Sequence, residues 1–250
     1  FTQGEETSVS AFIWGENSSK SRMVLGVSIV NLVREIAGQE PPLEIESVTL
    51  GEEVAIPWNE RLLPFIVLMA VFFGGMFLPA TSIINEREKR TLTALLVTPT
   101  TLEDVFITKG IVGIVLSLLS GVVILLLNQA FGAQPILLVM MLALGAIMAA
   151  GLGLLMGIVI KDVATLFAVW KLGGILLFGP AFIYMFPQIP QWIGQLFPTY
   201  YILQPIVDIS QRGAGWEAIA TNVFILIALD LLLIGVVALS LRRAKQVVAL

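Results

Sequence analysis

The chain has no cysteine and no histidine among its 250 residues. Without cysteine there is no disulfide framework and no thiolate nucleophile. Without histidine the commonest metal ligand and the commonest general base are missing. Ordinary hydrolytic catalysis is therefore not expected, and we name no catalytic residue, no metal site and no cofactor held by this chain.

Charge is also scarce, since charged residues make up 13% of the chain and hydrophobic residues 57%. The mean hydropathy is +0.94, and one soluble core of this size cannot hide so much apolar surface. The net charge of -4 arises largely from ten Glu in the first 60 residues, which leaves no basic face to neutralise phosphates. These features predict a lipid bilayer as the surroundings and exclude nucleic acid as a partner.

Long apolar segments account for the high hydropathy. Each has roughly 20 to 25 residues, enough for a helix to span the ~30 Å hydrocarbon layer. Helix is the expected state because an open strand in lipid leaves backbone groups without hydrogen bonds. Any one segment could be a buried helix of a soluble protein, but five in succession predict an all-α polytopic membrane protein. The segments are Leu62 to Ile84, Val105 to Asn128, Ile136 to Ile160, Val163 to Phe186 and Asn222 to Leu241.

Lysine and arginine near the segment ends set the expected orientation. They gather between the first and second spans, between the third and fourth, and after the fifth, whereas the short opposite loops carry only Arg212. The positive-inside rule then places residues 85–104 and the C-terminus in the cytoplasm and residues 1–61 outside a plasma or bacterial inner membrane. Because an outside N-terminal region needs a preceding helix, we expect six spans in the full protein. The charges are Arg87, Lys89, Arg90, Lys109, Lys161, Arg242, Arg243 and Lys245.

Two regions are expected outside the membrane. Residues 1–61 are predicted to form a small α+β region, incomplete at its N-terminus, ahead of a transmembrane domain over 62–250. Its helix is capped by Ser18 or Ser19 and ends at Gly38, and strands are expected at 8–14 and 43–50.

The second external region, residues 187–215, is apolar and aromatic. It is predicted as a re-entrant or interfacial turn-helix element, with an ordinary aromatic belt as the alternative. We expect Pro187, Pro190, Pro198 and Pro205 to break it into pieces. We name Pro190, Trp192, Pro198 and Tyr200 as an external gate segment.

The cytoplasmic stretch from Asn85 to Gly110 has an unusual pattern for a loop. Alternating charges over 86–90 lead into an amphipathic turn with Leu92, Leu95 and Leu96, and Pro99 ends that helix. Thr101 with Asp104 then offers an N-terminal capping box for the second span. A solvated, charged connector is the alternative interpretation.

The sequence EKRTLTALLVTP, followed ten residues after its proline by Lys109 and Gly110, resembles the cytoplasmic signature of type-2 permeases of ATP-binding-cassette (ABC) exporters. The external PQIPQWIGQLFPTYYILQPI is similar to a segment of the same family. Many members of that family have glycine immediately before the threonine, where this chain has Arg90.

The resemblance implies a permease subunit with a coupling helix near 86–98 that docks on a separate ABC ATPase, which carries ATP and Mg. It also implies a second permease copy, identical or related. This chain has no GxxxxGK[ST] phosphate loop, so we expect no ATPase site of its own. The coupling residues implied are Glu88, Lys89, Arg90, Thr91, Leu92, Leu95, Leu96 and Pro99.

Within the membrane, two charges and a glycine run stand out. Lys171 is about 12 Å and Asp230 about 16 Å from the cytoplasmic ends of their spans, so a pair is predicted. Alternatively, Lys171 extends to the interface. Gly151, Gly153 and Gly157 lie within a span and predict close helix packing, not a dinucleotide loop.

Two other classes of protein fit these residues less well. An ion-coupled secondary transporter more often has repeat symmetry and several intramembrane acids, whereas Asp230 is the only acid clearly at depth. A membrane-embedded enzyme needs a nucleophile with its base, or a set of metal ligands. The transported substrate stays open.

Overall fold

The computed structural model describes residues 25–30, 32, 58–91, 99–186 and 188–248. The chain divides into two compact units, residues 1–62 and 63–250. In the first unit, residues 25–30 and 32 are helical, inside the helix predicted there. The two predicted strands lie outside the described residues, and those that are described contain no strand. The external α+β fold and a sixth span are therefore unsupported.

All five predicted membrane-spanning helices are confirmed. The first span runs without interruption from Arg61 to Glu88 and combines α2 with a π-helical turn, η1, and α3. The last helix begins at Trp216, six residues before the expected Asn222 and directly after the external segment predicted over residues 187–215. The elements are α2 (Trp58–Phe72), η1 (Phe73–Phe77), α3 (Leu78–Glu88), α5 (Leu102–Leu127), α6 (Pro135–Val159), α7 (Val163–Met185), η2 (Gln191–Leu196), α8 (Tyr200–Arg212) and α9 (Trp216–Val248).

Local sequence signals account for several helix ends. The predicted capping box is confirmed, since the Thr101 hydroxyl accepts from the Asp104 N–H and the Asp104 carboxylate accepts from the Thr101 N–H. Asp162 caps α7 by accepting from the backbone N–H and the hydroxyl of Thr165, both at 2.7 Å. These hydrogen bonds lower the pKa of Asp162 below its ordinary value of 3.8.

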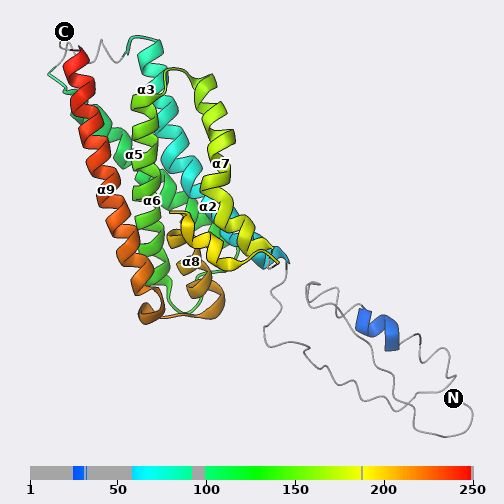
Figure 1. Ribbon diagram of the computed structural model, residues 1–250. Coiled ribbons are helices and arrows are strands. Elements are labelled where there is room, and N and C mark those ends of the chain that lie inside the picture. Colours follow the sequence, from blue (N-terminus) through cyan, green and yellow to red (C-terminus); the bar gives the residue numbers. More distant parts are fainter. Residues whose placement is uncertain (1–24, 31, 33–57, 92–98, 187, 249–250) are drawn as a thin grey trace, which may run out of the picture. The chain divides into compact units, whose positions relative to one another are not determined.

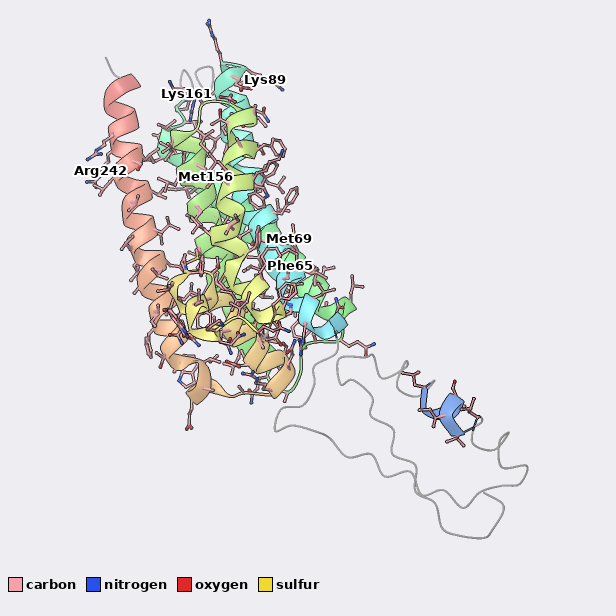
Figure 2. All side chains as sticks on the ribbon, turned by 45° about the vertical axis from the view of Figure 1, so that its right-hand side comes forward. Phe65, Met69, Lys89, Met156, Lys161 and Arg242 are labelled. Carbon is pink, nitrogen blue, oxygen red and sulfur yellow. The ribbon has the colours of Figure 1, made fainter. Side chains whose placement is uncertain are left out.

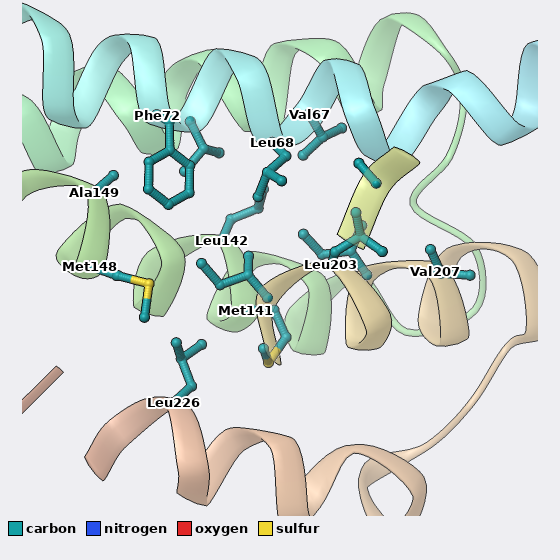
Figure 3. Packing of buried hydrophobic residues seen from close by; sticks show 14 of the residues in the cluster. Val67, Leu68, Phe72, Met141, Leu142, Met148, Ala149, Leu203, Val207 and Leu226 are labelled. Carbon is teal, nitrogen blue, oxygen red and sulfur yellow. The ribbon is translucent and has the colours of Figure 1, made fainter. Parts of the chain in front are cut away.

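Helix α6 is central in the bundle, where α5, α9, α3, η1 and α8 all pack against it (Figure 1). Over half of its most apolar stretch is buried, whereas that share is 17% for α9. Figure 3 shows how four helices share the core: Leu68 and Phe72 of α2 face Leu142 and Ala149 of α6, with Leu203 of α8 and Leu226 of α9 on the other side.

The close packing predicted from the glycine run is confirmed. A Cβ atom at Gly153 of α6 would lie 2.6 Å from the carbonyl oxygen of Met76 and 2.8 Å from that of Gly75, both in η1. At Gly157, it would meet the side chain of Ile83 at 2.8 Å. Only glycine permits the backbone of the π turn to approach α6 this closely.

The external segment folds as a 3₁₀ turn, η2, followed by helix α8. Pro190 precedes η2 and Pro198 separates the two elements, as predicted. The prediction that Pro205 breaks the segment is wrong, because it lies inside α8. The apolar face of α8, to which Pro205 belongs, is buried against α6 and α9, and this packing outweighs the hydrogen bond that proline cannot make.

Candidate functional site at the basic end of the bundle

One end of the bundle collects positive charge. Figure 2 shows Lys89 after α3, Lys161 between α6 and α7, and Arg242 in α9 toward this end, which we call the basic end. The opposite end holds η2 and α8 (Figure 1). Lys89, one of the residues predicted to contact an ATPase, lies at this end.

The first span ends in a sharp turn among the first of the predicted coupling residues. Lys89 is the C-cap of α3, and Arg90 follows with a φ of +56°, in the left-handed region that favours glycine. The Thr91 hydroxyl donates to the carbonyl oxygen of Glu86 at 3.2 Å. The coupling helix was expected to include Glu88, but that residue is the last of α3, because the membrane helix continues beyond the apolar run until a C-cap ends it.

Of the other coupling residues, Leu92, Leu95 and Leu96 lie outside the described residues. Pro99 is in a turn and exposed, and Lys89, Arg90 and Thr91 are also exposed. The structure thus places the polar part of the predicted coupling residues at the surface of the basic end.

A partly buried polar contact joins the first and second spans at this end. The ammonium of Lys109 in α5 donates to a carboxylate oxygen of Glu86 at 2.6 Å and to the hydroxyl of Ser82 at 2.7 Å. The exposed fractions of the Lys109 and Glu86 side chains are 16% and 27%. Partial burial makes this ion pair stronger than an exposed one, because water screens it less. It also holds together the ends of the first and second spans that the predicted coupling segment (residues 86–98) connects.

A second contact joins the first and third spans. The guanidinium of Arg87 donates from Nη1 to the carbonyl oxygen of Ile160 at 3.0 Å, and from Nη2 to those of Ile158, at 3.4 Å, and Gly157. These carbonyls belong to the last turn of α6, where no further helical N–H is available. The sequence identifies Arg87 only as one of the positive charges near a span end, because its hydrogen-bond partners are about seventy residues further along the chain.

A hollow of about 230 Å³ opens beside these contacts. The carboxylates of Glu86 and Asp104 and the ammonium of Lys109 lie around it, so it offers polar groups to a partner. Its lining residues are Glu86, Thr100, Asp104, Val105, Thr108 and Lys109.

The predicted intramembrane pair is not formed within the chain. Lys171 is exposed on α7, whereas Asp230 on α9 is only 4% exposed. Both carboxylate oxygens of Asp230 are buried and have no hydrogen-bond partner. Depth along two helices does not fix their rotation, and here the lysine faces outward while the acid faces the protein.

The four residues named as an external gate lie in or beside η2 and at the start of α8. Pro190, Trp192 and Pro198 are exposed and Tyr200 is partly buried. The Tyr200 ring is so close to Gly194 of η2 that a Cβ atom there would lie 3.0 Å from it. The fold therefore brings these residues together at the end opposite the basic end, and their gating role stays a prediction.

Comparison with known proteins identifies the class of this membrane protein. The sequence model of the family described as ABC-2 family transporter protein matches residues 1–239. No curated protein and no solved structure gives a significant match. A match over nearly the whole chain agrees with five spans and with both sequence motifs. The chain belongs to the ABC-2 transporter family and is a multi-pass type-2 ABC transporter permease.

Proposed function

We propose that this permease forms the translocation pathway of an ABC exporter and is driven by a separate ATPase that docks on the coupling segment. The observation that supports this most directly is the junction on either side of the segment. The Glu86–Lys109 ion pair and the Thr101–Asp104 capping box fix its two flanks, so a push on the segment would displace the first two spans together.

The orientation that we propose follows the charges. The basic end faces the cytoplasm of a cell membrane, and residues 1–61 and 187–215 lie outside. The positions of Lys89, Lys161 and Arg242 (Figure 2) support this orientation. A C-terminus on the cytoplasmic side follows, because α9 ends at the basic end (Figure 1).

We further propose that two copies, or this chain and a related permease, enclose the pathway. Helices α5 and α9 are the least buried spans, with 28% and 17% of their most apolar stretches inside the chain. Ile111, Val115 and Leu119 of α5 are exposed at a spacing of four residues and so form one apolar stripe. Lipid covers part of this surface, and the second permease covers the rest.

The orientation is tested with single cysteines, for which the chain is convenient because it has none. Lys89→Cys, at the basic end, should be protected from an impermeant thiol reagent added to intact cells. Gln134→Cys, exposed between α5 and α6 at the other end, should be labelled. The reverse pattern would overturn the proposed orientation.

The docking role is tested by replacing both Leu95 and Leu96 with Asp. Each leucine buried in a partner contributes on the order of 1–3 kcal/mol, so the double variant should insert normally but lose copurification with the ATPase and lose transport. Thr93→Asp adds a charge to the same segment at a position outside its leucine pattern and is the control. A double variant that still binds the ATPase would refute the assignment.

A further inference from the structure

We propose that Arg87 is a positioning residue that makes the third span, α6, follow the coupling segment during the transport cycle. The inference rests on the proposed function, because it assumes that the ATPase acts on residues 86–98. It goes beyond that function because the segment has covalent links only to the first two spans.

The geometry that carries the inference is a fork of hydrogen bonds. One guanidinium nitrogen of Arg87 donates to Ile160 and the other to Gly157 and Ile158, all through backbone carbonyl oxygens. Backbone atoms cannot move away from a contact by a side-chain rotation. The fork therefore attaches α3 to the end of α6 itself.

Arginine is suited to this position for two reasons. Its planar group presents five N–H donors in a rigid arrangement, so one side chain can serve several carbonyls at once. The C-terminus of a helix also carries partial negative charge, which favours a cation. Helix α6 ends at Val159 with Ile160 in an extended conformation, so a left-handed glycine cap is absent here and the arginine takes the place of such a cap.

The position of Arg87 turns this cap into a mechanical link. Glu86, the preceding residue, holds α5 through Lys109, and Arg90, three residues on, lies in the turn that follows α3. Two consecutive residues at the base of the segment thus hold one neighbouring span each. Because α8 and α9 pack on α6, a displacement of α6 would reach the external segment and the last span.

Lys89 provides a matched control. It lies two residues from Arg87, carries the same charge and is exposed. Lys89→Met removes one positive charge from the same surface without removing a contact to α6. In the permease without its ATPase, any effect of Arg87→Met on the distance to α6 that Lys89→Met does not share is an effect of the fork.

The first experiment uses the full chain in nanodiscs, with spin labels at Thr91→Cys and Lys161→Cys on the two sides of the fork. The parent and the Lys89→Met chain should give one narrow distance distribution. Arg87→Met should broaden it, and Arg87→Lys, which keeps the charge but not the fork, should recover the narrow distribution only in part. An Arg87→Met distribution as narrow as that of Lys89→Met would overturn the inference.

The second experiment uses the complex with its ATPase and follows thiol labelling of Gln134→Cys, at the far end of α6. Trapping with ATP and vanadate should change the labelling rate at least threefold in the parent. The change should be lost in Arg87→Met although ATP hydrolysis persists. If the parent chain copurifies with no ATPase, the proposed function fails, and the spin-label distances still decide whether Arg87 holds α6.

Discussion

The approach of the π turn to α6 gives the sharpest quantitative prediction. Replacing Gly153 with Ala would place a Cβ atom 2.6 Å from the Met76 oxygen and 2.8 Å from the Gly75 oxygen, well inside van der Waals contact. Because both atoms are backbone, the helices themselves must separate, and overpacking of this kind costs about 1–3 kcal/mol. The better helix propensity of alanine returns about 0.5–1 kcal/mol. The net expectation is a loss of about 1–2 kcal/mol.

Gly173 is the matched control, since it also lies within a span but a Cβ atom there would meet no atom within 4 Å. Gly173→Ala should therefore be neutral or should gain about 0.5–1 kcal/mol. Thermal unfolding of the purified chains in one detergent measures both. At about 2–4 °C per kcal/mol for a chain of this size, Gly153→Ala should lower the Tm by about 2–8 °C. Equal Tm values for Gly153→Ala and the parent chain would refute the close packing of η1 on α6.

Further variants test other features by the same measurement. A non-glycine residue in the left-handed conformation costs about 1–2 kcal/mol, and Arg90→Gly removes this cost while keeping the conformation. After the entropy loss of glycine, the variant should be more stable by about 0.5–1 kcal/mol; a lower Tm would contradict this. Asp230→Val removes a buried carboxyl group without a hydrogen-bond partner and should stabilise by about 1–3 kcal/mol. The effects of Asp230→Val and Lys171→Met on the free energy of unfolding should add within about 0.5 kcal/mol, because no ion pair joins the two residues. A larger coupling energy would show that they do form a pair. Asp162→Ala removes the cap of α7 and should lower the Tm at neutral pH. Because the pKa of Asp162 is lowered in the folded chain, its contribution to the free energy of unfolding is present above the ordinary pKa of 3.8 and is lost as the pH falls through the folded pKa. The difference in Tm between the variant and the parent should therefore shrink in acid. A difference that does not change with pH would contradict the assignment.

The features that the sequence predicts correctly depend on local chemistry. The spans follow from hydropathy, because lipid requires a run of apolar residues whatever packs beside it. The Thr101–Asp104 box depends on residues three apart, and the tight packing at Gly153 follows from the absence of a side chain. None of these needs knowledge of which helix is the neighbour.

The features that could not be predicted depend on how helices are rotated and paired. The partners of Arg87 are backbone carbonyls in α6, and no residue type in the sequence marks them. The isolation of Asp230 depends on which way α9 faces, and Pro205 is tolerated in α8 because of the surface that buries it. Many members of the family have glycine where this chain has Arg90, so the sequence shows the difference in residue type. It does not show that Arg90 adopts the left-handed conformation.

The contacts at η1 and at the basic end together limit where the permease can move. Helix α3 has eleven residues, about 16 Å at helical rise. One end of it begins at the glycine contacts of η1, and the other end is held by Glu86 to α5 and by Arg87 to α6. A segment attached to both neighbours at two levels cannot tilt separately from either of them, so the basic halves of the first three spans should move as one block. Relative motion then falls to α7, which joins this block through the extended residues Ile160 and Asp162 and packs on α6 far less than α9 does.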